Sequence, residues 1–186
     1  MQEEIKKCLE VLRQGGVILY PTDTIWGIGC DASNQEAVER VFQIKKRQES
    51  KALITLVNNE VMLERTVVDI PEIAWELIEA ADNPLSIIYE KVKGIAPNVL
   101  AQNGSCAIRL VKNDFCNKLI LQLKKPIVST SANVSGSDSP SNFSQIDKYI
   151  LDSVDYVVNH SQNEQENKSS SNIIELKNNG SIKIIR

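Results

Sequence analysis

The chain has 186 residues, of which 42% are hydrophobic, and its 21 basic and 24 acidic residues leave a net charge of −3. This length and composition predict one globular domain that spans residues 1–186 and buries a real core. The charge balance argues against a protein whose main task is to hold duplex nucleic acid, although a local basic cluster for a small anion remains compatible with it.

The N-terminal segment predicts an amphipathic helix that ends at Gly15-Gly16, because Ile5, Leu9 and Leu12 share one helical face. The charged residues between them are not typical of a signal peptide. No apolar run approaches the roughly 20 residues that span a bilayer, and the four cysteines show no C-x-x-C pair. The sequence therefore predicts a cytoplasmic protein without membrane contact.

The next segment, YPTDTIWGIGCDAS (residues 20–33), follows a predicted strand at 17–22 and is expected to form a glycine-containing loop. Its hydroxyl and carboxyl groups come directly after a buried strand, at the end where α/β sheets commonly bind ligands. The alternative is a plain turn in which Asp23 caps its own backbone.

A helix is predicted at 34–47, with a capping box formed by Ser33 and Glu36 at its start. The helix leads into KKRQESK (residues 45–51), which places four cations in seven residues. Such a cluster suits a solvated helix C-terminus on dipole grounds alone. Its functional interpretation is a clamp for phosphate groups, since arginine offers a planar fork and lysine a point charge.

The rest of the chain alternates between strand and helix patterns. Strands are predicted at 52–57, 85–91, 106–111, 126–131, 154–159, 172–177 and 181–186, and helices at 60–66, 71–81, 114–124 and 143–151. The sequence KNNG before the last strand predicts a tight antiparallel turn. The fold class is therefore α/β, with an open, twisted, mixed sheet and flanking helices.

Two further segments carry polar groups that could hold a ligand. Arg109 lies inside the apolar strand 106–111, where burial requires an anionic partner such as a substrate carboxylate, with Ser105 four residues before it. The alternative is an outward-facing charge on a half-exposed strand. The segment PIVSTSANVSGSDSPS (126–141) offers many donors for a phosphate or a base edge, unless it is a serine-rich linker.

Several kinds of site are not indicated. The only histidine, His160, lies in the polar tract 160–171, which argues against a Ser-His-Asp or Cys-His hydrolase. No cluster resembles a catalytic metal site, and the G-x-x-x-x-G-K-[ST] phosphate loop is missing. A nucleotide would have to be held by the dispersed segments, and the tract 160–171 is expected to be mobile or ordered only by ligand.

Together these segments resemble the YrdC/TsaC family, the threonylcarbamoyl-AMP synthases. The resemblance is carried, in family order, by GGVILYPTDTIWGIGCDA, AVERVFQIKKRQESKAL, CAIRLV, PIVSTSANVSG with SP after it, and SNIIEL with the terminal IIR. It implies a single YrdC-like domain whose sheet surrounds a concave positive cavity. It also implies that L-threonine, bicarbonate and ATP, the last with Mg²⁺, give threonylcarbamoyl-AMP and pyrophosphate.

The same resemblance implies partners and roles. The product would pass to the threonylcarbamoyl transferase machinery that makes threonylcarbamoyladenosine (t6A) in tRNA, and a weak contact with tRNA itself is compatible with it. No protein nucleophile is needed, so the resemblance implies positioning residues and no catalytic one. The threonine site would comprise Thr24, Arg109, Ser131 and Ser171, and the ATP site Lys45, Arg47, Lys51, Ser105, Asn133, Ser141 and Arg186.

Two alternatives remain open at this point. The first is a YrdC-like module that binds RNA or a nucleotide without catalysis, against which the net charge and the lack of interleaved aromatic and basic residues argue. The second is a sugar-phosphate enzyme such as dihydroxybutanone-phosphate synthase, which should show an acidic metal-binding cluster near the first loop. Only Asp23 and Asp31 are available there.

Overall fold

A computed structural model describes residues 1–46, 53–164 and 169–186. Its strands, in chain order, are β1 Ile18–Tyr20, β2 Gly27–Gly29, β3 Ile54–Val57, β4 Leu85–Tyr89, β5 Cys106–Leu110, β6 Ile127–Ser131, β7 Tyr156–Val157, β8 Asn172–Leu176 and β9 Ile182–Ile184. Within the described residues they form one sheet in the order β7-β1-β2-β6-β3-β5-β4-β8-β9. Three neighbouring pairs are parallel and five antiparallel. The expected α/β class with a mixed sheet is confirmed.

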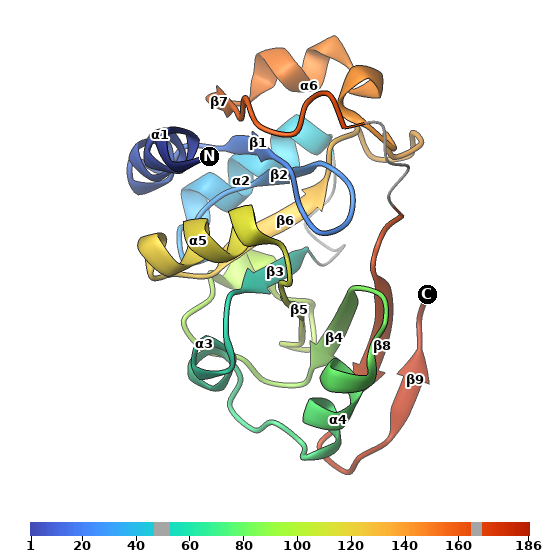
Figure 1. The fold of residues 1–186 in the computed structure, drawn as a ribbon. Helices are drawn as coiled ribbons and strands as arrows, with labels where there is room; N and C mark the ends of the chain where they lie inside the picture. The colour runs from blue at the N-terminus through green and yellow to red at the C-terminus, as the bar shows by residue number, and fades with distance from the viewer. Residues whose placement is uncertain (47–52, 165–168) are drawn as a thin grey trace.

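The helices occupy the connections between these strands. They are α1 Gln2–Arg13, α2 Gln35–Lys45, α3 Glu60–Thr66, α4 Ile73–Ala80, α5 Asp114–Leu123 and α6 Lys148–Ser153, with short 3₁₀ turns η1 Pro97–Val99 and η2 Phe143–Gln145. In Figure 1, α1 and α5 lie side by side in front of the upper strands β1, β2 and β6, and α2 lies behind them. The strands β4, β5, β8 and β9 form the lower part with α4.

Local sequence features explain where the first two helices form. Helix α1 buries one stripe of apolar side chains and carries two glutamates in its first turn, which complement the helix dipole. Helix α2 begins one residue later than the predicted capping box requires. Its cap is Asn34, whose side chain accepts the amide hydrogen of Ala37 at 3.1 Å. The Ser33 hydroxyl instead donates to Asp31, so the predicted capping box is wrong.

Strand β2 is the main element that the sequence did not predict, since Gly27-Ile28-Gly29 was expected to lie in a loop. Glycine weakens strands in general, but here β2 is paired on both sides, with β1 and with β6. A Cβ atom at Gly29 would lie 2.3 Å from the carbonyl oxygen of Val128 and 2.7 Å from the ring of Tyr20. The close contact with these neighbours therefore requires glycine at this position.

Two helix starts also differ from expectation. The segment 143–151 begins with the 3₁₀ turn η2, and α6 follows only at Lys148, where the Asp147 side chain caps it by accepting the amide hydrogen of Tyr149. Helix α4 begins at Ile73, two residues after the predicted proline start. The KNNG turn is confirmed: β8 and β9 pair antiparallel, and Gly180 has a positive φ of 84°.

One face of the sheet collects the polar residues of several strands. Cross-strand partners point to the same face, and the register pairs Arg109 of β5 with Leu56 of β3 and with Ser86 of β4. It also pairs Ser86 with Ile173 of β8, and Gly27 of β2 with Ser131 of β6. The hydroxyls and the arginine therefore share a surface at the middle of the sheet.

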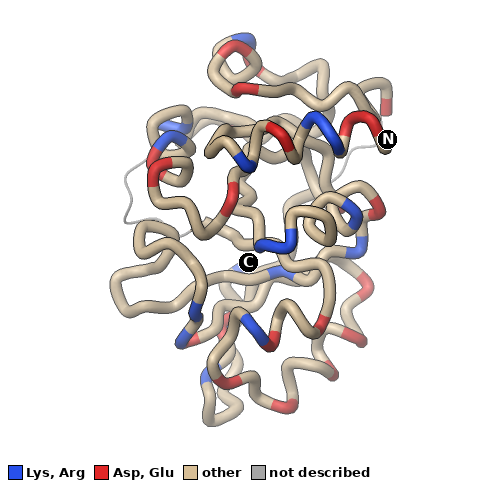
Figure 2. The backbone as a smooth tube through the Cα atoms, turned by 90° about the vertical axis from the view of Figure 1, so that its left-hand side faces the viewer, with Lys and Arg blue, Asp and Glu red and all other residues tan. Residues whose placement is uncertain are grey.

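Charges of both signs are interspersed along the backbone in Figure 2, which matches the small net charge. The four cysteines are buried and free. Among the described residues, no helix has both the length and the apolar character to cross a membrane.

Candidate functional site

A cavity of about 180 Å³ lies where the β1–β2 loop, the strands β5 and β6, the start of β8 and the end of the chain meet. It is small, open to one side and mixed in character, with hydroxyl groups, apolar side chains and two arginines. The described residues that line it are Thr24, Ile25, Trp26, Gly27, Leu53, Ile54, Arg109, Ser129, Thr130, Ser131, Ser139, Ser170, Ser171, Ile173 and Arg186.

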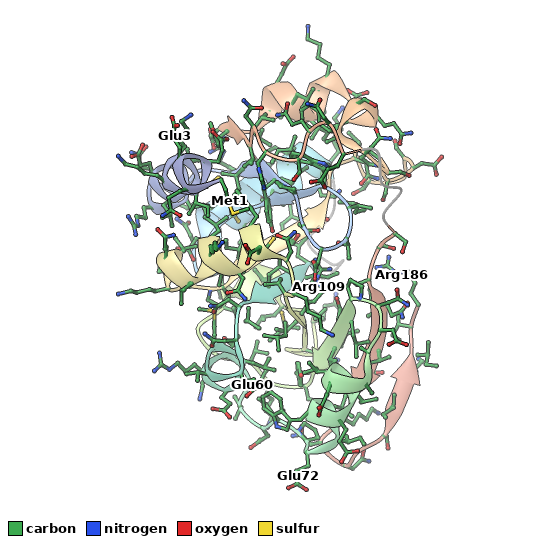
Figure 3. The ribbon with its side chains drawn as sticks, viewed as in Figure 1. Met1, Glu3, Glu60, Glu72, Arg109 and Arg186 are labelled. Carbon is green, nitrogen blue, oxygen red and sulfur yellow. The ribbon has the colours of Figure 1, made fainter. Side chains whose placement is uncertain are left out.

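Arg109, labelled in Figure 3, is one of the two arginines that line this cavity, and only 3% of its surface is exposed. Its Nη2 donates to Oδ1 of Asp23 at 2.9 Å, so the interpretation of Arg109 as an outward-facing charge is wrong. The Nε group is also buried, and no described residue accepts its hydrogen. Because Arg109 lines the cavity and a guanidinium carries five N–H donors, its contact with Asp23 leaves further donors for a ligand anion.

The loop between β1 and β2 is fixed by the hydroxyl of Thr22. That hydroxyl donates to the carbonyl of Ile25 at 2.7 Å and accepts the amide hydrogen of Thr24 at 3.0 Å. Because its one hydrogen is used, the 2.9 Å contact between the two threonine hydroxyls requires Thr24 to be the donor. The Thr24 oxygen, which lines the cavity, then offers only acceptor lone pairs to a ligand.

The opposite wall is held by the end of the chain. Arg186 donates from Nε and Nη2 to the carbonyl oxygen of Ser171, at 3.1 and 3.0 Å. The Ser171 hydroxyl lies 2.8 Å from that of Ser86, which is the strand partner of Arg109. Through Ser86, Ser171 is thus linked to the strand position of Arg109, although 62 residues separate Ser171 from Arg109 in the sequence.

Lys45 does not line this cavity among the described residues, and 2% of its surface is exposed. Its ammonium donates to the carbonyl oxygens of Ser131 and Asn133, at 2.5 and 2.7 Å. A buried cation needs such acceptors, and here they join the end of α2 to the segment after β6. The predicted contact of Lys45 with ATP phosphates therefore stays a prediction.

The other residues assigned to ATP are spread over the structure. Arg186 lines the cavity, Ser141 lines a neighbouring cavity of about 20 Å³, and Ser105 lines a third one of about 220 Å³. Asn133 lines none of these cavities. Its side-chain amide donates to the carbonyl of Ser137 at 2.6 Å and so shapes its own loop.

Arg47 and Lys51 lie outside the described residues, so the phosphate clamp predicted there is not tested. By contrast, the four residues assigned to L-threonine, Thr24, Arg109, Ser131 and Ser171, all line the one cavity.

Sequence reasoning missed other parts of the site. The proposed turn cap at Asp23 is instead the partner of Arg109. Ser129 joins the cavity because it lies two residues before Ser131 and points to the same face of β6, a period that the sequence does show. Ser139 and Ser170 come from connecting segments, where side chains do not alternate between two faces as they do in a strand, so no sequence signal pointed to them.

Among the residues that the structure describes, the cysteine thiols and the phenol of Tyr20 are not activated as nucleophiles. Burial raises the pKa of all four cysteine thiols, to about 12 for Cys8 and about 11 for Cys106. Burial also raises the pKa of the Tyr20 phenol well above its ordinary value. These groups are neutral near pH 7, and His160 stacks on Phe115 rather than lining the cavity.

Comparisons with known proteins identify related chains and folds. The Sua5/YciO/YrdC family, described as telomere recombination, matches residues 10–186. The threonylcarbamoyl-AMP synthase of Pseudoalteromonas translucida is 32% identical over 160 residues, which cover 84% of this chain and 86% of that protein.

Solved structures show the same fold. The structure of P. abyssi Sua5 complexed with L-threonine superimposes with a TM-score of 0.82 at 25% identity, over 92% of this chain and 50% of the Sua5 chain. The chain thus spans about half the length of that protein. E. coli YciO has a TM-score of 0.83 at 23% identity, over 100% of this chain and 89% of its own.

Proposed function

Because the chain belongs to the Sua5/YciO/YrdC family, we propose that it is an L-threonylcarbamoyladenylate synthase, a nucleotidyltransferase. It joins L-threonine, bicarbonate and ATP into threonylcarbamoyl-AMP and releases pyrophosphate. The product serves tRNA modification to t6A through a threonylcarbamoyl transferase in the cytoplasm. The observation that carries the proposal is the cavity that brings Thr24, Arg109, Ser131 and Ser171 together.

The polarity of the cavity suits an amino-acid zwitterion. At one side, Arg109 keeps a buried N–H donor for a carboxylate. At another side, Thr24 presents acceptor lone pairs, which match the N–H groups of an amino acid. The apolar side chains of Ile54 and Ile173 in the same wall suit the methyl group of L-threonine. The relative Sua5 was solved in complex with this amino acid.

The chemistry follows from holding the reactants together. The ammonium group of L-threonine first loses a proton to solvent, the amine then attacks the carbon of bicarbonate, and loss of water leaves a carbamate. A carbamate oxygen then attacks the α-phosphorus of ATP, and pyrophosphate leaves with the bonding electron pair. Neither step needs a covalent bond to the protein, which agrees with the neutral, buried thiols. The chain contributes position and charge balance.

The nucleotide enters in this proposal as the Mg²⁺ complex of ATP. Among the described residues, no group of three or more histidine, cysteine or acidic side chains could hold a metal ion. When bound, Mg²⁺ would neutralise part of the charge on the phosphate groups of ATP. Arg186 at the cavity, Ser141 beside it and Ser105 further along the sheet are the described groups that we assign to ATP.

The test is to incubate the protein with Mg²⁺, ATP, L-threonine and bicarbonate and to measure pyrophosphate and the adenylated product. We expect pyrophosphate release that requires both L-threonine and bicarbonate. Nucleotide binding without pyrophosphate release would overturn the synthase and favour the non-catalytic binding module. Release that is independent of L-threonine would indicate a different acceptor.

A further inference from the structure

Asp23 and Arg109 form an ion pair that is almost fully buried. The side chains expose 8% and 3% of their surface, and Nη2 of Arg109 lies 2.9 Å from Oδ1 of Asp23. Asp23 comes from the β1–β2 loop and Arg109 from β5, 86 residues later. The pair therefore connects the loop that carries Thr24 to the strand at the base of the cavity.

The pair engages the guanidinium on one side only. Asp23 accepts from Nη2, and the second carboxylate oxygen lies 3.5 Å from the amide nitrogen of Lys112, at the limit of a hydrogen bond. The Nε group of Arg109 is left buried with no acceptor among the described residues. Asp23 thus holds one end of the guanidinium and leaves its other N–H donors for another anion.

The pair also sets the charge of the cavity base. Arg109 alone would attract any anion, including the phosphates of ATP and the pyrophosphate product, because charges interact strongly at buried sites. With Asp23 at 2.9 Å, the base of the cavity is close to neutral. A nearly neutral position, whose remaining N–H donors are oriented by the contact with Asp23, suits the carboxylate of a zwitterion better than it suits a polyanion.

We propose that Asp23 is a positioning residue for the amino-acid substrate. It holds the Arg109 guanidinium in the orientation that receives the carboxylate of L-threonine, and it lowers the affinity of this position for phosphates. The inference rests on the proposed synthase function. If the Asp23–Arg109 pair only joined the β1–β2 loop to β5, it would stabilise the fold, and its loss would affect the use of L-threonine and of ATP equally.

The test compares Asp23→Asn with wild type in steady-state assays of pyrophosphate release. We expect the KM for L-threonine to rise at least tenfold, the KM for ATP to stay within twofold, and inhibition by added pyrophosphate to strengthen. Asp23→Glu, which keeps the charge on a longer side chain, should raise the KM for L-threonine about threefold. An unchanged KM for L-threonine, or equal changes for both substrates, would overturn the proposal.

A matched control is Asp155→Asn, which breaks another aspartate–arginine pair, with Arg40, at residues that do not line the cavity. Its KM values should equal those of wild type. If Asp23→Asn does not fold, Asp23→Glu supplies the same comparison, and an unchanged KM for L-threonine in that variant overturns the proposal.

Calorimetric titration with L-threonine tests the role of Asp23 independently of the proposed synthase function. Wild-type protein that binds L-threonine but releases no pyrophosphate would end the synthase proposal, while weaker binding by Asp23→Asn would still support the role of Asp23. Equal binding by both proteins would refute that role.

Discussion

Replacing Arg109 by alanine should change substrate use and stability together, for two separate reasons. A charge-assisted hydrogen bond to a substrate carboxylate is worth about 1.5–3 kcal/mol, so the KM for L-threonine should rise about 10- to 150-fold. The variant also leaves Asp23, whose side chain is 8% exposed, without its partner. Removing one member of a buried pair costs about 3–5 kcal/mol in the free energy of unfolding.

The two effects need two assays. Initial rates of pyrophosphate release, with one substrate varied at saturating concentrations of the other, give the KM for L-threonine and for ATP. Urea unfolding gives the stability, and the double variant Arg109→Ala/Asp23→Asn should lose less stability than Arg109→Ala because no unpaired carboxylate remains. Equal factors for the two KM values would refute the assignment of Arg109 to the amino acid.

Three further predictions concern other parts of the chain. Thr22→Val should free the hydroxyl hydrogen of Thr24 for the cavity and raise the KM for L-threonine severalfold in the same rate assay, with the KM for ATP unchanged. Arg47→Ala, outside the described residues, should weaken ATP binding about 10- to 150-fold by calorimetry without unfolding the chain; unchanged affinity would return this segment to a solvated helix end. Arg40 lowers the pKa of Asp155 through their hydrogen bond, so the stability that this pair contributes is present above the unfolded pKa of about 4 and is lost as the pH falls through the folded value. Because both side chains are more than a third exposed, Arg40→Ala should cost at most about 1 kcal/mol at pH 7, and urea unfolding should show a smaller cost as the pH is lowered through the folded pKa of Asp155.

Much of the fold follows from local sequence signals. The apolar stripe of α1, the runs that became β3 and β5, and the KNNG turn each depend on residues within one segment. Such patterns predict an element because burial of one face determines the spacing of its apolar residues. Strand β2 was not predicted, because the close contacts with Tyr20 and Val128 that require glycine at Gly29 are not visible in a local sequence pattern.

The site was predictable in its residue types and only partly in its contacts. An arginine inside an apolar strand indicated an anionic partner, but the sequence could not identify Asp23, which lies 86 residues away. A lysine at a helix end looks the same in sequence whether it meets phosphate or carbonyl oxygens. The structure adds the contacts of Lys45 with the carbonyl oxygens of Ser131 and Asn133, which the sequence could not identify.

The spacing between Ser105 and Arg109 does not place the two residues in one cavity. Residues four apart on a strand share a face, but Ser105 directly precedes β5, which contains Arg109 and begins at Cys106. At 3.3 Å per residue, Ser105 and Arg109 are about 13 Å apart along the chain, and each lines a different cavity. If both bind one reaction complex, the amino acid lies at Arg109 and the nucleotide must extend along β5 toward Ser105. The division of the site into a compact amino-acid cavity and a longer nucleotide surface then follows from the direction of a single strand.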